Sequence, residues 1–276
     1  MKLYKVFLCV GAATLLIGLP SRGDVIISTG GTYTGQVTRA TANDVMIKQG
    51  QNEFTVPKAT IKKLEVDKPA ELDAARDALK AGKNLQAATA LKTLVERYAG
   101  LPVDWAMDAM VALSDAQIAL KDYIGAKRVL DDAIRLYPGE QARRLEVKTA
   151  RLLMAQGNQA KTVEILRLFL AVATKRDLLT DEDEYAIAEA YVMLGDCLIT
   201  TNAEDALDNY LKVVTLFDLD TDRATEAQCK AGKAFEQLKN WKRAKNLYED
   251  AAKGDPKSPF TAEAKSRLEV VTKEHP

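Results

Sequence analysis

The sequence predicts a mainly helical protein with a small all-β part near its amino-terminal end. Short segments within residues 24–67 alternate apolar and polar residues and are rich in Val, Ile and Thr, which is typical of strands. From residue 70 onward the spacing of apolar residues is helical, and one pattern of small and aromatic residues returns along the chain. We therefore expect three parts: residues 1–23, 24–67 and 70–276.

The first 23 residues have the composition of a secretory signal peptide. Lys2 and Lys5 precede an apolar run at residues 6–19, and small residues follow at Ser21 and Gly23, where cleavage would occur. An uncleaved membrane anchor is the alternative, but the run is shorter than the roughly 20 residues that span a bilayer. We expect export to a bacterial periplasm and no stable membrane insertion after cleavage.

Residues 24–67 are expected to form five strands separated by turns at residues 30–31, 43–44 and 50–52. The runs G-x-Y-x-G-x-V, from Gly31, and V-P-x-x-x-I-x-x-L, from Val56, resemble the SH3-like and Sm-like small-barrel family. That resemblance implies a small barrel or a strongly bent sheet. Because so small a core is marginally stable alone, we expect it to dock against the first helices.

An internal repeat is clearest at residues 114–138 and 232–256, which carry small, apolar and proline residues at the same spacing. These are Ser114, Tyr123, Ala126, Leu130, Ala133 and Pro138, and then Gly232, Trp241, Ala244, Tyr248, Ala251 and Pro256. A third copy, at residues 191–213, is one residue shorter in its loop, and two looser copies lie near Ala75 and at residues 144–169. The pattern resembles the tetratricopeptide-repeat (TPR) family. The resemblance implies five helical hairpins, stacked as a superhelix with a concave side and closed by a capping helix.

The glycines and prolines of the repeats have expected structural roles. Gly195 and Gly232 would lie where the two helices of a hairpin cross, because a larger side chain would push the helices apart. Pro138 and Pro256 would end the second helices of their hairpins, because proline lacks the backbone donor.

The repeat register also predicts a binding groove on the first helices of the hairpins. Its residues mix acidic, basic and apolar side chains, which suits an extended peptide or a helix that bears both a charge and an apolar anchor. The predicted groove residues are Asp108, Val111, Asp115, Glu189, Val192, Asp196, Glu226, Cys229, Lys233 and Glu236.

Two further stretches, at residues 96–110 and 255–268, resemble loop-and-helix sequences of exported repeat proteins. Such proteins include the Tol-Pal-associated periplasmic coordinator and the repeat lipoprotein of the outer-membrane β-barrel assembly machinery. This resemblance implies a location in the cell envelope. The chain departs from both families, because it has no lipobox and has β segments where the coordinator has a coiled coil.

Composition argues against an enzyme, a cofactor or a nucleic-acid partner. Lys+Arg and Asp+Glu are equal at 39 each, so no excess of positive charge favours nucleic acid or anionic lipid. The single histidine, His275, lies next to the carboxyl terminus, which leaves little material for a catalytic triad or a histidine metal site. Asp218, Asp220 and Asp222 resemble the start of a calcium loop, but Arg223 stands where glycine is required. We expect these acids to cap the next helix.

Cys197 and Cys229 are the cysteines that would remain after cleavage, and the repeat register puts them on the first helices of adjacent hairpins. An oxidising compartment would allow a disulfide between them, with two buried single thiols as the other outcome.

The sequence thus favours a non-enzymatic protein–protein interaction scaffold of the bacterial cell envelope. The alternative is a structural protein that self-assembles through exposed repeat ends. Lys265, Arg267 and Glu269 predict a polar outer face for the last helix, which would cap the stack and oppose open-ended assembly.

Overall fold

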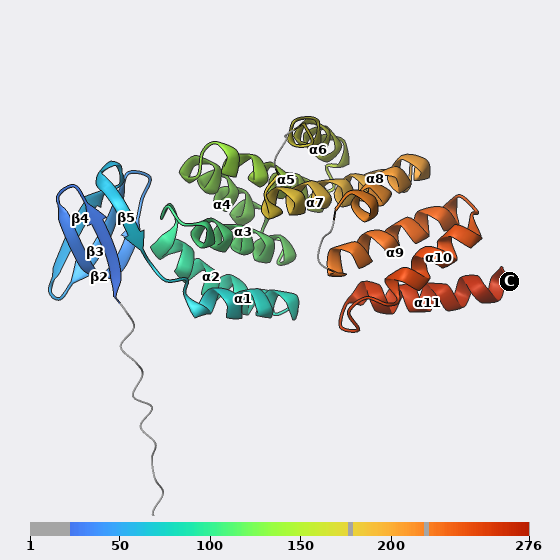
Figure 1. Cartoon of the computed structure of the whole chain (residues 1–276), viewed down its shortest axis with the longest axis horizontal. Coiled ribbons are helices and arrows are strands. Elements are labelled where there is room, and N and C mark those ends of the chain that lie inside the picture. The colour runs from blue at the N-terminus through green and yellow to red at the C-terminus, as the bar shows by residue number, and fades with distance from the viewer. Residues whose placement is uncertain (1–22, 176–178, 218–220, 276) are drawn as a thin grey trace, which may run out of the picture.

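The computed structural model describes residues 23–175, 179–217 and 221–275, and strands precede a long helical array in it (Figure 1). The expected signal peptide lies outside these residues, except for Gly23. The strands lie at one end of the molecule and the last helix at the other. The predicted fold class, a TPR-like superhelix after a small antiparallel β-sheet, is confirmed.

Five strands form one antiparallel sheet in the order β4-β3-β2-β1-β5. They are β1 (Asp24–Ser28), β2 (Gly31–Ala40), β3 (Asp44–Gln49), β4 (Asn52–Pro57) and β5 (Ile61–Glu65), with a short 3-10 helix, η1 (Lys58–Thr60), between the last two. Five strands were expected within residues 24–67, and five are present there. Within the described residues no ladder joins β4 to β5, so the sheet is open at these two strands.

The sheet is bent and has one buried face. The ladder registers shift between Ile27 and Ser28 and between Val37 and Arg39, and such irregularities bend strands. Gly35 permits a close approach of β2 and β3, because a Cβ there would lie 2.0 Å from the carbonyl oxygen of Lys48. The sheet contributes buried apolar side chains to the same core as the first helices: Ile26, Val37, Val45, Ile47 and Val56.

The sheet docks against the helices, as expected for so small a β part. The Nε of Arg97 donates to the carbonyl oxygen of Val37 at 2.5 Å. Lys58 donates to the carbonyl oxygens of Thr41 and Gly100, which ties the sheet to the loop after the second helix. These polar contacts and the shared core hold the β part to the start of the array.

Eleven helices follow in the described part of the chain. They are α1 (Ala70–Lys80), α2 (Asn84–Tyr98), α3 (Asp104–Ala119), α4 (Tyr123–Leu136), α5 (Glu140–Ala155), α6 (Gln159–Ala173), α7 (Asp181–Leu198), α8 (Ala203–Leu216), α9 (Thr221–Gln237), α10 (Trp241–Ala251) and α11 (Pro259–Glu274). Helices α1 to α10 pair as five consecutive hairpins, and α11 packs against α9 and α10. The expected five repeats and the final helix are therefore present.

The turns inside the hairpins share a backbone geometry. In four hairpins a residue with a left-handed φ stands two positions before the second helix, and the next residue is its N-cap. These left-handed residues are Gly82 (φ 71°), Lys121 (61°), Gly157 (77°) and Lys239 (57°). The shorter loop of the third copy, in the fourth hairpin, has no such residue among those described, and Asn202 caps α8 directly.

The predicted crossing points are correct. A Cβ on Gly195 would lie 2.4 Å from the ring of Tyr210, and one on Gly232 would lie 2.6 Å from the ring of Tyr248. Both tyrosines are buried in the second helix of the same hairpin. The two glycines therefore make room for a ring that fills the crossing.

The two prolines differ in role. Pro138 follows Tyr137, the C-cap of α4, in agreement with the prediction. The prediction for Pro256 is wrong, because α10 already ends at Ala251 and the proline lies in the loop before α11.

Candidate protein-binding face

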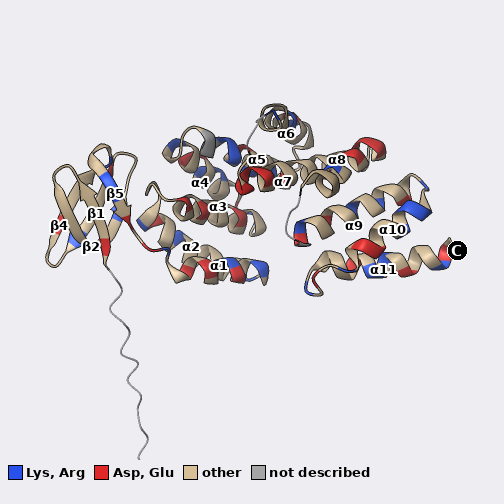
Figure 2. Cartoon of the chain, in the orientation of Figure 1, with Lys and Arg blue, Asp and Glu red and all other residues tan. Residues whose placement is uncertain are grey.

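Contacts join α1 to α3, α3 to α5, α5 to α7 and α9 to α11, and the ion pair between Lys230 and Asp196 joins α9 to α7, so these helices form one layer of the array. We call the side chains of α3, α5, α7, α9 and α11 that meet across this layer the odd-helix face. Basic and acidic residues alternate along the array and do not separate by sign (Figure 2). All the predicted groove residues lie on three of these helices, α3, α7 and α9. Within each helix they are spaced by three, four or seven residues, which keeps them on one side of that helix.

A first cavity, of about 330 Å³, lies between α5, α7 and α9. Four predicted groove residues line it: Glu189, Val192, Asp196 and Glu226. Met154 and Met193 add apolar surface, and Arg151 and Arg223 add charge. Four of the predicted residues therefore line one cavity. Helix α5, which carries no predicted groove residue, lines it as well.

A second cavity, of about 230 Å³, lies between α3, α5 and α7. Asp108 and Val111 line it from α3, and Tyr185, 39% exposed, lines it from α7. Glu189 lines both cavities, so they adjoin. Together they form a continuous lining of mixed charge and apolar surface.

The charged groove residues are not free, because ion pairs connect each odd helix to the next. We call this series the charge ladder. Its pairs between helices are Arg76–Asp108 (3.0 Å), Arg151–Asp115 (3.5 Å), Arg151–Glu189 (2.6 Å), Lys148–Glu189 (2.6 Å), Arg144–Asp183 (3.2 Å), Lys230–Asp196 (2.6 Å), Lys233–Glu263 (2.5 Å) and Arg267–Glu236. Glu226 is bonded within α9 to Arg223 at 2.7 Å and to Lys230 at 2.9 Å.

Glu189 is the centre of the charge ladder. Its side chain is 7% exposed and lies between Lys148 and Arg151 of the neighbouring helix. Burial alone would raise the pKa of this carboxyl, but the two cations more than offset burial and hold the pKa at about 2. The carboxylate therefore stays ionised and ties α5 to α7.

Two other predicted groove residues also bond to the core. The hydroxyl of Tyr210 donates to Asp196 at 2.9 Å, and the hydroxyl of Tyr248 donates to Glu236. Lys233 and Glu236 lie outside both cavities and pair with α11. The side chains of Asp196, Lys233 and Glu236, like that of Glu189, therefore connect helices, whereas Val192 offers apolar surface to the first cavity.

The sequence prediction includes Lys233 but misses the cations of α5. Arg144, Lys148 and Arg151 of α5 supply the positive charges of the central ladder. Their spacing of four and three residues would have shown that they share one side of a helix. The repeat pattern is weak at residues 144–169, so it predicts no groove residues on α5.

The possible disulfide is not formed. Cys197 and Cys229 are both free and buried. Cys229 lies in the core of the last hairpin, with its Sγ 3.8 Å from a carboxylate oxygen of Glu263 on α11. Its thiol therefore points toward the next helix along the array, and burial raises its pKa to about 11.

Among the described residues no group of three or more His, Cys, Asp and Glu side chains is arranged to hold a metal ion. Asp218 and Asp220 of the calcium-like run lie outside the described residues. The ring of His275 stacks on Trp241, with centroids 3.7 Å apart. Within the same described ranges, no helix has the length and apolar character needed to cross a membrane.

Residues 226–258 match the tetratricopeptide repeat family, and this match covers most of the fifth hairpin. A TPR protein from Parabacteroides merdae is similar in structure, with a TM-score of 0.52 and 18% identity over 73% of this chain and 70% of that one. The helical array has a TPR fold. A TPR protein from Thermus thermophilus has a TM-score of 0.50 and 14% identity over 73% of this chain and 97% of that one.

A third similar structure is a signal transduction ATPase with numerous domains from Pyrococcus horikoshii, which carries a TPR sensor. It has a TM-score of 0.50 and 17% identity over 73% of this chain and 31% of that one. No curated protein matches the sequence. The TPR repeats themselves indicate a protein that binds other proteins.

Proposed function

We propose that this chain is a non-enzymatic scaffold of the bacterial cell envelope that binds a peptide or helix segment of a partner protein on its odd-helix face. The observation that carries the proposal is the pair of adjoining cavities on this face. Both have apolar lining and charged walls, which suits a segment that carries an apolar anchor and charges of both signs.

The charge ladder supports binding mainly through apolar side chains of the partner. Its carboxylates already have partners, so a ligand gains little by replacing one ion pair with another. Exposed apolar surface is available instead, at Met154 in one cavity and Tyr185 in the other, 37% and 39% exposed. We propose that apolar side chains of the partner contact these two residues, while its charges align with the ladder.

The place of action follows from residues 1–23, whose composition favours export and cleavage after Gly23. We propose a periplasmic location and envelope partners on that basis. The strand order and the 3-10 helix between β4 and β5 support the proposed SH3-like relationship of the β part.

The outer surface of the last helix supports a scaffold over a self-assembling protein. The exposed residues of α11 include Lys265, Ser266, Glu269 and Lys273. Arg267 instead turns inward and bonds Glu236 of α9. A polar outer surface caps the stack and opposes end-to-end association of copies.

The proposal predicts that charged substitutions at the two anchors will release the partner. We expect Met154→Glu and Tyr185→Glu each to lower recovery of the co-purified envelope protein about tenfold, because a desolvated anchor contributes about 1.5 kcal/mol or more. Recovery would be measured by quantitative mass spectrometry after purification from the source cells.

The matched control is Ile124→Glu, which makes the same kind of change at an apolar residue of α4 that is 87% exposed and lies outside both cavities. It should leave recovery unchanged. Equal recovery of the partner with all three variants would contradict binding at the odd-helix face.

A further inference from the structure

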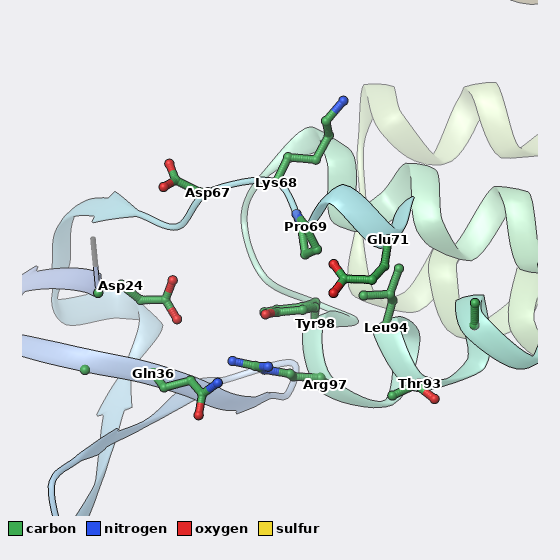
Figure 3. A pocket seen from close by; sticks show the side chains of 13 residues that line it. Asp24, Gln36, Asp67, Lys68, Pro69, Glu71, Thr93, Leu94, Arg97 and Tyr98 are labelled. Carbon is green, nitrogen blue, oxygen red and sulfur yellow. The ribbon is translucent and has the colours of Figure 1, made fainter. Parts of the chain in front are cut away.

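A larger cavity, of about 680 Å³, lies at the junction between the sheet and the first hairpin (Figure 3). Its walls come from the start of β1, the middle of β2, the segment between β5 and α1, and one side of α2. It shares no lining residue with the two cavities of the odd-helix face. Any ligand bound here would therefore contact a separate surface.

Tyr98, on α2, places a polar group inside this cavity. The residue is 7% exposed, and its ring packs edge-on against Trp105 with centroids 5.0 Å apart. Its hydroxyl makes no hydrogen bond to any of the described residues, and Figure 3 shows it directed into the cavity. A phenol oxygen fixed in this way is available to a ligand as donor or acceptor.

Carboxylates of Asp24 and Glu71 lie on either side of the hydroxyl, and Asp67 lines the cavity farther from it. Asp24 accepts the backbone N–H of Val37 at 2.6 Å. Asp67 and Glu71 have no hydrogen bond or ion pair within the described part of the chain. Burial raises the pKa of Tyr98, Arg97 lowers it, and the charges of Asp24 and Glu71 raise it further, which is consistent with carboxylates close to the phenol.

The two basic residues of the cavity are held by other groups. Lys68 pairs with Asp73, outside the cavity, at 2.7 Å. Arg97 donates to Val37 and lies over the ring of Tyr98, 4.7 Å from its centroid. With Lys68 paired to Asp73, the charge of Arg97 balances only one of the carboxylates among the described lining residues, which are Asp24, Asp67 and Glu71, so the cavity has an excess of negative charge.

The remaining wall is apolar. Ala90, Leu94 and Pro69 line it beside the carboxylates. A lysine or arginine side chain combines these requirements, because its methylene stem packs on apolar surface while its charged end reaches polar groups. A small inorganic cation would leave the apolar wall without a contact.

We propose that this junction cavity binds a lysine or arginine side chain of a protein partner. The cationic end lies between the carboxylates of Asp24 and Glu71, and the Tyr98 oxygen accepts one of its N–H groups. The basic segment docks where the sheet meets α1 and α2. This site adds a second contact to the scaffold and does not depend on ligand binding at the odd-helix face.

The test uses a labelled peptide of sequence Ala-Lys-Ala-Lys-Ala with blocked ends, and fluorescence anisotropy with the purified protein. We expect saturable binding that weakens as salt is added, and no binding of the same peptide with acetylated lysines. Tyr98→Phe and Glu71→Gln should each weaken binding about tenfold, since each removes a hydrogen bond or ion pair to a charged group. Glu96→Gln, on the same helix but outside the cavity, should leave binding unchanged.

Tyr98→Phe keeps the buried ring and removes only the hydroxyl, so the folded state should be unaffected. Binding that is equal in Tyr98→Phe and the wild type would overturn the proposal. So would displacement of the peptide by 1,4-diaminobutane at or below the peptide's own Kd, which would indicate a free amine as the ligand. Because cleavage after Gly23 is proposed, the same measurement is made on the mature chain that begins at Asp24, and loss of binding there would overturn the proposal, since the chain's own amino group would then fill the cavity.

Discussion

Replacing Gly232 by leucine is expected to lower the free energy of unfolding by about 3 kcal/mol, the upper end for overpacking of a buried site. Even a single Cβ at this position would lie 2.6 Å from the ring of Tyr248. That ring cannot move freely, because Tyr248 is buried and its hydroxyl donates to Glu236. The variant would therefore separate α9 from α10 and weaken the fifth hairpin. Urea unfolding followed by circular dichroism measures the loss.

The matched control for this prediction is Gln237→Leu, which places the same side chain at an exposed position of α9. It should change stability by less than about 0.5 kcal/mol. If the Gly232 variant unfolded at the same urea concentration as the control, the assigned crossing of α9 and α10 would be wrong.

Replacing Glu189 by glutamine is expected to destabilise the protein by about 3 kcal/mol at pH 7, because it leaves two cations near a buried neutral group. The cations are Lys148 and Arg151, each 2.6 Å from a carboxylate oxygen of Glu189. The glutamine keeps the shape of the side chain, so the change isolates the charge. Glu164→Gln, at an exposed position of α6, serves as the control and should have little effect.

The stability difference between the wild type and Glu189→Gln is expected to depend on pH. The folded-state pKa of Glu189 is about 2, below its ordinary value of 4.5, so its ionised form stabilises the folded state. This contribution, about 3 kcal/mol from the difference in pKa, is present above the ordinary value and is lost as pH falls toward 2. The stability difference between wild type and Glu189→Gln should therefore shrink between about pH 5 and pH 2. A difference that stays constant over this range would contradict the central role of Glu189.

Local patterns were sufficient to predict the order of the elements. The five strands within residues 24–67 follow from short segments of alternating apolar and polar residues bounded by turn residues. The hairpins follow from the repeated spacing of small residues such as Gly195 and Gly232, which only a close helix crossing requires. The strands and the helix crossings both depend on residues that lie within about one repeat of each other in the sequence.

The chemistry of the face could be predicted only in part. Helical spacing correctly placed Glu189 and Val192 on the odd-helix face, but it could not show that both are buried there. Burial depends on how closely α5 and α9 approach α7, which is a property of the stacked repeats. The cations of α5 share one side of their helix by spacing, but their pairing with Glu189 and Asp183 could not be predicted, because it depends on the approach of two hairpins.

The cavity at the sheet–helix junction could not be predicted from the sequence. Asp24, Glu71 and Tyr98 come from three different elements, and only the docking of the sheet brings them together. The ring of Tyr98 is buried against Trp105. The sequence does not show that its hydroxyl faces a cavity.

Photocrosslinking in living cells of the source organism tests the binding proposal most directly, with the photoreactive residue at Met154 on the odd-helix face. A second photoreactive residue at Lys127, on the exposed side of α4, reports non-specific contacts. The proposal predicts a discrete crosslink from Met154, and none from Lys127, to an envelope protein. Crosslinks from Met154 only to a second copy of this chain, or to a protein that stays in the cytosol, would contradict a periplasmic scaffold.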